Sequence, residues 1–541
     1  MFFKTLIVLG AAAVVYVAPA RASVVTAHAV HDYISRKWNV DIPYDENMRG
    51  GLVNMKYLMQ AVDATNEVLN NVKTSNYAAD TNYASTALAA TDVAKESIDT
   101  LVKKWDFGFW VVPEGGSTFK MNIASAGTFF IAWGDGTVQE FTKGVGPQDY
   151  SHTYVDGDAS AHKVYVGGEV TAHATTENGA IWFGMDGYKV REVGGCIGCV
   201  FHTIGDGREA WQQPKFYETF MDNTMLTSVP AGFFDGLHGG GYRMFYKTFN
   251  ASRLMEIPEK LFGDSQLTTE SNMFQDTFNG CSQLKEIPAD LFAGLSGAPA
   301  LGMFSGTFSG CKNLTGSIPG ELFAGIAGKP ASSMFGNTFA NCSNLSGSIP
   351  GNLFAGIKGA SAEGMFRATF ANCSNLSGSI PGDLFAGIKA PLTPSTFRET
   401  FSGCSNLSGS IPSNLFAGIS GSSAANSFNS TFRGCSGLTS IPEDLFGDIS
   451  SSTATAGLFY QTFYGCTGLT GPSARVGKPG ARQYLYERWP DTSADGGMLS
   501  PSSGCYNNAT GLTDYACIPT NWGGAGTKEP GTCETAATVN R

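Results

Sequence analysis

Hydrophobic and polar residues follow one pattern that recurs along the second half of the chain. Each unit contains a Thr-Phe pair, and successive pairs lie 29 to 31 residues apart. The best-kept units read MFxxTFxxCxxLxxSIPxxLFAGI, as from Met365 to Ile388. This period predicts a repeat protein in which each unit buries its hydrophobic side chains against the next unit. Units 1 to 9 are marked by Thr219, Thr248, Thr277, Thr307, Thr338, Thr369, Thr400, Thr431 and Thr462.

Phenylalanine is concentrated at three positions of the repeat. The Met-Phe, Thr-Phe and Leu-Phe positions together hold 26 of the 37 Phe residues. A ring that returns once per unit is expected to stack on its equivalents, so each position predicts a ladder of buried rings. The Leu of the CxxL motif and the Ile or Val before Pro complete the predicted core.

Short elements can be assigned within each unit. The LxxSIP stretch predicts a strand that Pro ends, because Pro cannot donate to a strand ladder. The PxxLFAGI stretch predicts a short helix, with Pro in its first turn and Gly near its end. The two Phe of MFxxTF are four residues apart, which suits one face of a helix. The expected fold class is therefore α+β, with nine units of 29–31 residues.

The FxxCxxLxxIP pattern resembles the repeat of BspA-type leucine-rich-repeat surface proteins. The resemblance covers residues 216–472, and the LFAGI segment is an insert relative to that pattern. It implies a leucine-rich-repeat-like solenoid, and a role in cell-surface adhesion and protein binding.

A smaller β-rich module is expected before the repeats, over residues 107–175. Trp133 to Thr137 read WGDGT, and His152 to Tyr154 read HTY. Gly-Asp-Gly between β-forming residues predicts a tight hairpin turn that Asp135 caps, with His152 as a structural residue. These motifs resemble the polycystic-kidney-disease-type (PKD-like) β-sandwich module.

The remaining segments have distinct compositions. Residues 1–22 combine Lys4, an apolar run and small residues, as in a secretory signal peptide. Residues 23–106 are rich in helix formers and predict an N-terminal helical segment. Residues 176–215 are expected to form a linker and entry cap. Residues 473–541 retain Gly511-Leu512 and Ile518-Pro519 and are expected to form a C-terminal cap and tail.

The charge balance excludes one class of partner. The chain has 541 residues, only 15% of them charged, and a net charge of −11. We find no basic stripe of the kind that nucleic-acid binding requires. The expected protein is exported to the cell surface, the medium or the periplasm, and its mature chain has no transmembrane segment.

The chain has twelve cysteines, which could form disulfides, bind a metal or remain free thiols. Seven recur in the repeat and are expected to be buried free thiols, because side chains of one column point in parallel. The pair Cys196 and Cys199 is expected to be a local disulfide or two unrelated buried thiols, since neither a second CxxC nor a His pair at zinc-ligand spacing is present. Cys505, Cys517 and Cys533 are expected to include one pair that links the cap, with Cys505 and Cys517 as the preferred pair.

No catalytic, metal or cofactor site is expected. The repeat positions hold no His, paired carboxylates or activated nucleophile, so the chain is not expected to be an enzyme. Enzymatic function would require His173, His202 and a carboxylate around one pocket.

The expected function is non-enzymatic binding of a protein or glycan, as in an adhesin. The alternative is a structural spacer or assembly protein of the envelope or periplasm. The expected contacts lie between LFAGI and the next Met-Phe, where variation costs no core packing. They are Ser361, Glu363, Thr393, Ser422 and Asn426.

Overall fold

A computed structural model describes most of the chain from residue 108 onward. The expected signal peptide and helical segment lie outside the described residues. The chain divides into two compact bodies. The first body comprises the described residues up to Ala174, those between 185 and 204, and Gly232–Leu237. The second body comprises all other described residues. The described residues are 108–135, 137–174, 179–183, 189–204, 212–262, 266–449, 455–478, 482–489, 502–528 and 532.

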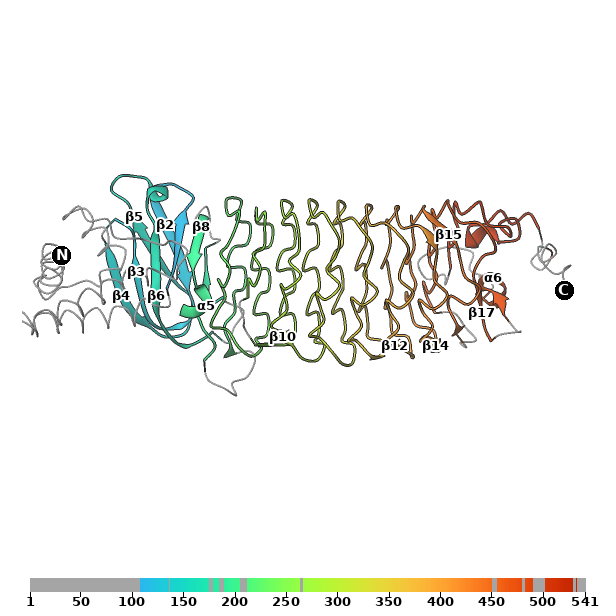
Figure 1. Cartoon of the computed structure of the whole chain (residues 1–541), viewed down its shortest axis with the longest axis horizontal. Helices are drawn as coiled ribbons and strands as arrows, with labels where there is room; N and C mark the ends of the chain where they lie inside the picture. Colours follow the sequence, from blue (N-terminus) through green and yellow to red (C-terminus); the bar gives the residue numbers. More distant parts are fainter. Residues whose placement is uncertain are drawn as a thin grey trace, which may run out of the picture. The chain divides into compact units, whose positions relative to one another are not determined.

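The first body contains two antiparallel β-sheets in a sandwich-like arrangement (Figure 1). One sheet has the order β4-β3-β6-β1-β8, and in the other β2 pairs with β5. Because β8 pairs with β1, this sheet continues beyond the expected end of the module at residue 175. The elements are β1 (Phe109–Pro113), β2 (Thr118–Ile123), β3 (Ala126–Ala132), β4 (Val138–Lys143), β5 (Gln148–Thr153), the 3-10 helix η3 (Ala159–Ala161), β6 (Val164–Ala172), β8 (Val190–Gly195) and α5 (Ile197–Val200).

The expected hairpin turn joins β3 to β4. Trp133 N–H donates to the carbonyl of Thr137 at 2.9 Å, and Asp135 accepts from the Thr137 N–H at 2.8 Å. Asp135 also lies 2.6 Å from Nε2 of His152. Burial raises the pKa of Asp135, but the hydrogen bonds from Thr137 and His152 outweigh burial and lower it overall. Asp135 therefore caps its own turn, as the sequence predicts.

The second body is a long region of periodic units with short parallel strands. In Figure 1 the units form a row of similar backbone turns, coloured from green to orange. The parallel pairs are β9 with β10, β11 with β12, β13 with β15 and β14 with β16. The elements are β7 (Ile181–Trp182), β9 (Leu267–Thr268), β10 (Leu295–Ser296), β11 (Gly359–Ala360), β12 (Ile388–Lys389), β13 (Gly409–Ser410), β14 (Ser420–Gly421), β15 (Leu438–Ser440), β16 (Asp448–Ile449), β17 (Arg475–Val476), β18 (Gln483–Tyr484), α6 (Leu485–Arg488) and η5 (Thr520–Trp522).

The MFxxTF stretch is not helical, so this expectation was wrong. It is a series of turns. Every second backbone N–H donates to a carbonyl of its own unit, and the N–H groups between them donate to carbonyls of the next unit. Thr338 N–H donates to Phe335, three residues back, whereas Phe339 N–H donates to Thr369 in the next unit at 2.9 Å. The backbone is left-handed at every fourth residue, as at Asn337 and Asn341. A helix cannot contain such residues, and the hydrogen bonds that replace it come from the neighbouring unit.

The LFAGI stretch is also built of turns rather than the expected helix. In unit 5, Leu353 N–H donates to Pro350 and Ala355 N–H donates to Asn352. Most of the short strands follow this stretch, and only β13 and β15 lie in the predicted LxxSIP position. Neither α5 nor α6 lies within residues 216–472, so the described part of the repeat region is built of turns and short strands.

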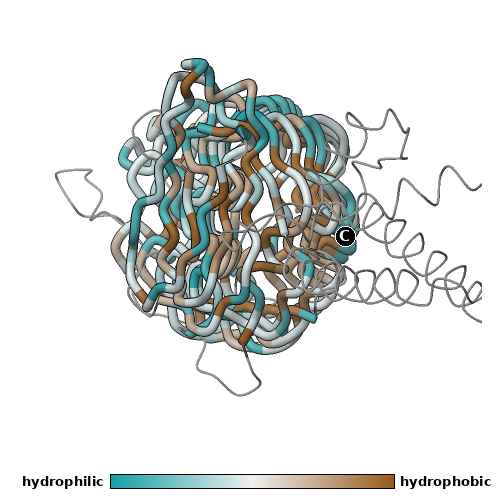
Figure 2. The backbone as a smooth tube through the Cα atoms, turned by 90° about the vertical axis from the view of Figure 1, so that its left-hand side faces the viewer, coloured by the Kyte–Doolittle hydropathy of each residue, from teal (hydrophilic) through white to brown (hydrophobic). Residues whose placement is uncertain are grey.

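The predicted ladders of Phe rings are confirmed. Phe339 of the Thr-Phe position stacks on Phe308 at 5.7 Å and on Phe370 at 5.8 Å, and none of the three is exposed. The Met-Phe and Leu-Phe rings stack in the same way and also meet each other, as where Phe335 lies 4.5 Å from Phe354. Figure 2 shows hydrophobic and hydrophilic stretches of the backbone interspersed when the chain is viewed from its left-hand end in Figure 1.

The Thr-Phe ladder extends beyond the nine units at both ends. Phe183 stacks on Phe220 at 5.5 Å before unit 1, and Tyr506 stacks on Phe463 at 5.5 Å after unit 9. Leu512 forms a parallel bridge with Gly471, which places residues 504–513 in register with unit 9. The C-terminal segment is thus a tenth, degenerate unit, as Gly511-Leu512 predicts.

Candidate binding face

The Thr and Cys positions of the repeat connect neighbouring units. Thr338 Oγ1 donates to the carbonyl of Phe304 at 3.0 Å, and Cys342 Sγ donates to the carbonyl of Phe308 at 3.0 Å. Each of these carbonyls also accepts a backbone N–H of its own unit. The hydroxyl and the thiol therefore use the second lone pair of a buried carbonyl, so both positions have a structural role.

The seven repeat cysteines are buried free thiols, as predicted. Burial raises the pKa of Cys373 to about 12 and raises the pKa of the other repeat thiols as well. At neutral pH these groups stay protonated. A protonated thiol without solvent access is neither a nucleophile nor a metal ligand.

The CxxC motif forms a local disulfide between Cys196 and Cys199, which is one of the two arrangements expected for it. The expected link between Cys505 and Cys517 is wrong, because Cys505 is a buried free thiol while Cys517 is disulfide-bonded. The reason is the register of the tenth unit. Cys505 precedes Tyr506 as Thr462 precedes Phe463, so it takes the inward Thr position of the ladder.

The exposed side chains of these turns come from the x positions. In MFxxTFxxC the Met, the two Phe, the Thr and the Cys are buried, whereas x positions such as Arg367 and Asn372 are exposed and others, such as Ala368, are buried. We call these positions in units 1 to 9 the variable face. The Tyr and Arg residues among them are Tyr217, Tyr246, Arg367, Arg398, Arg433, Tyr460 and Tyr464.

The variable face of units 1 and 2 is an aromatic and cationic cluster. The rings of Tyr217 and Tyr246 stack at 4.9 Å. Nζ of Lys247 lies 5.2 Å from the centre of the Tyr246 ring and 3.8 Å from Glu218. The guanidinium of Arg243, next to the face, lies 4.9 Å from the Tyr246 ring. The half-buried rings are thus held in place by their neighbours.

The variable face of units 6 to 9 carries arginines. Nε of Arg398 lies 2.9 Å from Glu399, and the guanidinium of Arg433 lies 5.1 Å from the Tyr464 ring. Arg367 and Arg433 are exposed. In the part of the chain that the structure describes, no carboxylate pairs with Arg367 or Arg433.

The five expected contact residues are not equally accessible. Glu363 and Ser422 are exposed, whereas Ser361 has only 7% of its surface exposed. Ser361 Oγ donates to Pro391 and lies 2.9 Å from Oγ1 of Thr393 in the next unit. Asn426 is half-buried and accepts from Asn429. Ser361, Thr393 and Asn426 thus connect parts of the repeat, and the sequence reasoning missed the variable face.

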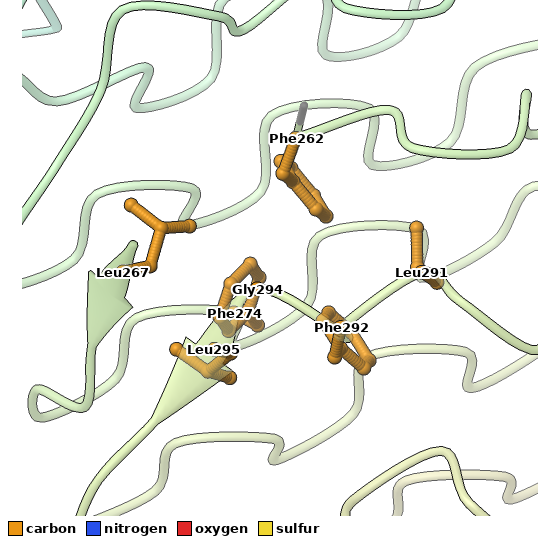
Figure 3. A pocket seen from close by; sticks show the side chains of 7 residues that line it. All are labelled: Phe262, Leu267, Phe274, Leu291, Phe292, Gly294 and Leu295. Atoms are coloured by element: carbon orange, nitrogen blue, oxygen red, sulfur yellow. The ribbon is translucent and has the colours of Figure 1, made fainter. Parts of the chain in front are cut away.

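A small cavity between two units is lined by hydrophobic side chains. This cavity of about 10 Å³ lies between the Leu-Phe segments of adjacent units. Figure 3 shows only carbon in the side chains that line it. It has neither the polar partners nor the room that a bound polar molecule needs. Its lining residues are Phe262, Leu267, Phe274, Leu291, Phe292, Gly294 and Leu295.

The histidines examined as catalytic candidates have structural partners. Ser125 Oγ lies 2.9 Å from Nδ1 of buried His173, and Nε2 of His173 donates to the backbone carbonyl of His202 at 2.9 Å. Ser125 is fully buried, so no substrate reaches its hydroxyl. No group of three or more His, Cys, Asp or Glu side chains suited to a metal ion occurs among the described residues.

Comparisons with known proteins add no further identity. No known family model matches the chain, and no characterised protein or solved structure is significantly similar to it. Within the described ranges, no helix has the length and apolar character needed to span a membrane.

Proposed function

We propose that this is an exported, non-enzymatic surface protein that binds a protein or glycan partner through a leucine-rich-repeat-like solenoid of the BspA type. The observation that carries the proposal is the composition of the variable face. Among its residues are Tyr, Arg, Asn, Ser and Gly, which are enriched in antibody binding surfaces or at binding hot spots. The PKD-like module would act as a spacer.

Rigidity supports this assignment. The rings at Tyr217 and Tyr246 are stacked, and the turns that carry them are hydrogen-bonded to both neighbouring units. A preorganised face loses little conformational entropy when a partner binds. Interaction positions built on such a scaffold can vary from unit to unit without disturbing the Phe ladders.

The test is a binding screen of the full chain on arrays of glycans and purified extracellular proteins. We expect retention of a defined ligand, and at least about a tenfold loss of affinity in a Tyr460→Ala/Tyr464→Ala or a Tyr217→Ala/Tyr246→Ala variant. The matched control is Ser346→Ala/Ser377→Ala, which changes two units outside the variable face. Equal binding by all variants, or no ligand at all, would contradict the proposal.

The alternative, a structural spacer or assembly protein, makes a different prediction in solution. Light scattering of the full chain would then report an oligomer whose mass rises with concentration. A strict monomer that retains a ligand favours the binding function.

A further inference from the structure

The central repeat units differ in charge from the rest of the chain. Between Leu301 and Ser440 there are seven basic and four acidic residues, whereas the whole chain has a net charge of −11. Three of the basic residues are the arginines of the variable face. Arg367, Arg398 and Arg433 belong to units 6, 7 and 8, so they lie on three successive turns of the backbone.

Little negative charge offsets these arginines. Glu399 is the one acidic residue on the variable face of units 6 to 8, and it pairs with Arg398 at 2.9 Å. Glu363 lies outside the face, four residues before Arg367. A local excess of positive charge on a chain that is acidic elsewhere attracts an anionic partner to this place.

Polar groups and aromatic rings accompany the arginines. Asn372 and Ser402 supply an amide and a hydroxyl on the same face. The half-buried rings of Tyr460 and Tyr464 follow in unit 9. Amides and hydroxyls pair with sugar hydroxyls, while rings pack against the C–H faces of a sugar.

The backbone of this face is not available to a partner. Ala368 N–H donates to Arg398 at 2.8 Å, and Gly403 N–H donates to Arg433 at 2.7 Å. A peptide therefore cannot add as a further strand, which is how an extended chain gains most main-chain hydrogen bonds. Recognition has to use side chains alone, which favours a polymer recognised by its substituents.

We infer that the variable face of units 6 to 9 binds a linear acidic polysaccharide, with the three arginines holding its carboxylate or sulfate groups. The guanidinium fork suits both groups, because each accepts two parallel hydrogen bonds. This inference rests on the proposed binding function and specifies its ligand class.

Surface plasmon resonance of the full chain tests it with four probes. Polygalacturonate carries carboxylates, chondroitin sulfate carries sulfates as well, dextran is neutral, and poly-L-glutamate is an acidic peptide. We expect binding to one or both acidic polysaccharides that weakens as salt is added, and much weaker binding to dextran and poly-L-glutamate. The first two probes distinguish a carboxylate from a sulfate as the main group.

Charge variants locate the site. Arg367→Gln/Arg398→Gln/Arg433→Gln should lower the affinity at least about tenfold. Lys329→Gln/Lys358→Gln/Lys389→Gln removes the same charge from exposed positions outside the face and should change the affinity less than about twofold. Glu399→Gln should raise the affinity, because it removes the carboxylate that competes for Arg398. A purely structural role of these residues would not produce that gain.

Three outcomes would overturn the inference. Equal losses in the Arg and Lys variants would indicate unspecific attraction. If poly-L-glutamate or dextran bound more tightly than the acidic polysaccharides, and this binding depended on the variable face, the ligand would belong to another class. The proposed binding function would still hold. Failure to bind any probe, with a ligand found on the arrays, would remove only this inference; failure on the arrays as well would remove both.

Discussion

The hydroxyl of Thr338 donates a hydrogen bond to the carbonyl of Phe304, a residue of the preceding unit, at 3.0 Å. The same bond recurs from Thr369 to Phe335 and from Thr400 to Phe366. It explains why a fully buried core position is Thr rather than Val. The hydroxyl adds a hydrogen bond to a buried carbonyl that accepts only one backbone N–H, from its own unit.

Thr338→Val should therefore lower the free energy of unfolding by about 1 kcal/mol, since it keeps the shape and leaves part of a buried carbonyl unsatisfied. Thr338→Ser is the matched control, because it keeps the hydroxyl and loses a methyl group. Chemical denaturation followed by circular dichroism measures both. A Val variant as stable as the wild type would mean that this bond contributes nothing to folding.

The buried thiols should make the protein sensitive to alkali. Burial raises the pKa of Cys373 to about 12 from an ordinary value of 9.0, so the unfolded chain loses this proton first as the pH rises. Stability is fully present below pH 9.0 and falls between pH 9.0 and about 12. The melting temperature measured across this range should fall less steeply in a Cys373→Ala variant. Identical slopes would show that this thiol does not titrate differently in the two states.

The backbone of these turns is left-handed at every fourth residue. Replacing a glycine at such a position with a residue that has a Cβ should therefore lower the free energy of unfolding. Gly434 has φ 74°, and an added Cβ would meet no atom closer than 3.7 Å. Gly434→Ala should thus cost about 1 kcal/mol of unfolding free energy from backbone conformation alone. Gly434→Asn should cost less, since Asn tolerates this region better. Equal denaturation midpoints for the two variants would argue against a left-handed residue here.

Thiol mapping checks the cysteine assignments. Alkylation of the denatured, unreduced protein, followed by peptide mass spectrometry, should label Cys505 and the seven repeat cysteines. Cys196, Cys199 and Cys517 should be labelled only after reduction. A peptide that joins Cys505 to Cys517 would overturn the register of the tenth unit.

The helices expected in the repeat show where sequence reasoning failed. Two Phe four residues apart suit a helix, but they equally suit a chain of four-residue turns. The distinction rests on left-handed residues such as Asn337 and Asn341 and on hydrogen bonds to the neighbouring unit. Those bonds join residues about 30 positions apart, and no local pattern records them.

The variable face was missed because contacts were expected only between LFAGI and the next Met-Phe. The turns of successive units are hydrogen-bonded in register, and this places Arg367, Arg398 and Arg433 on one face. The variability of the x positions beside the invariant Phe and Thr was a signal that could have indicated it.

The sequence by itself determined the number of units, the three Phe ladders and the buried thiol column. All of these depend on which residue types recur along the chain. Only the tertiary structure decided the turn geometry, the inward place of Cys505 and the residues that face solvent. These depend on hydrogen bonds between units, which exist only when one unit is stacked on the next.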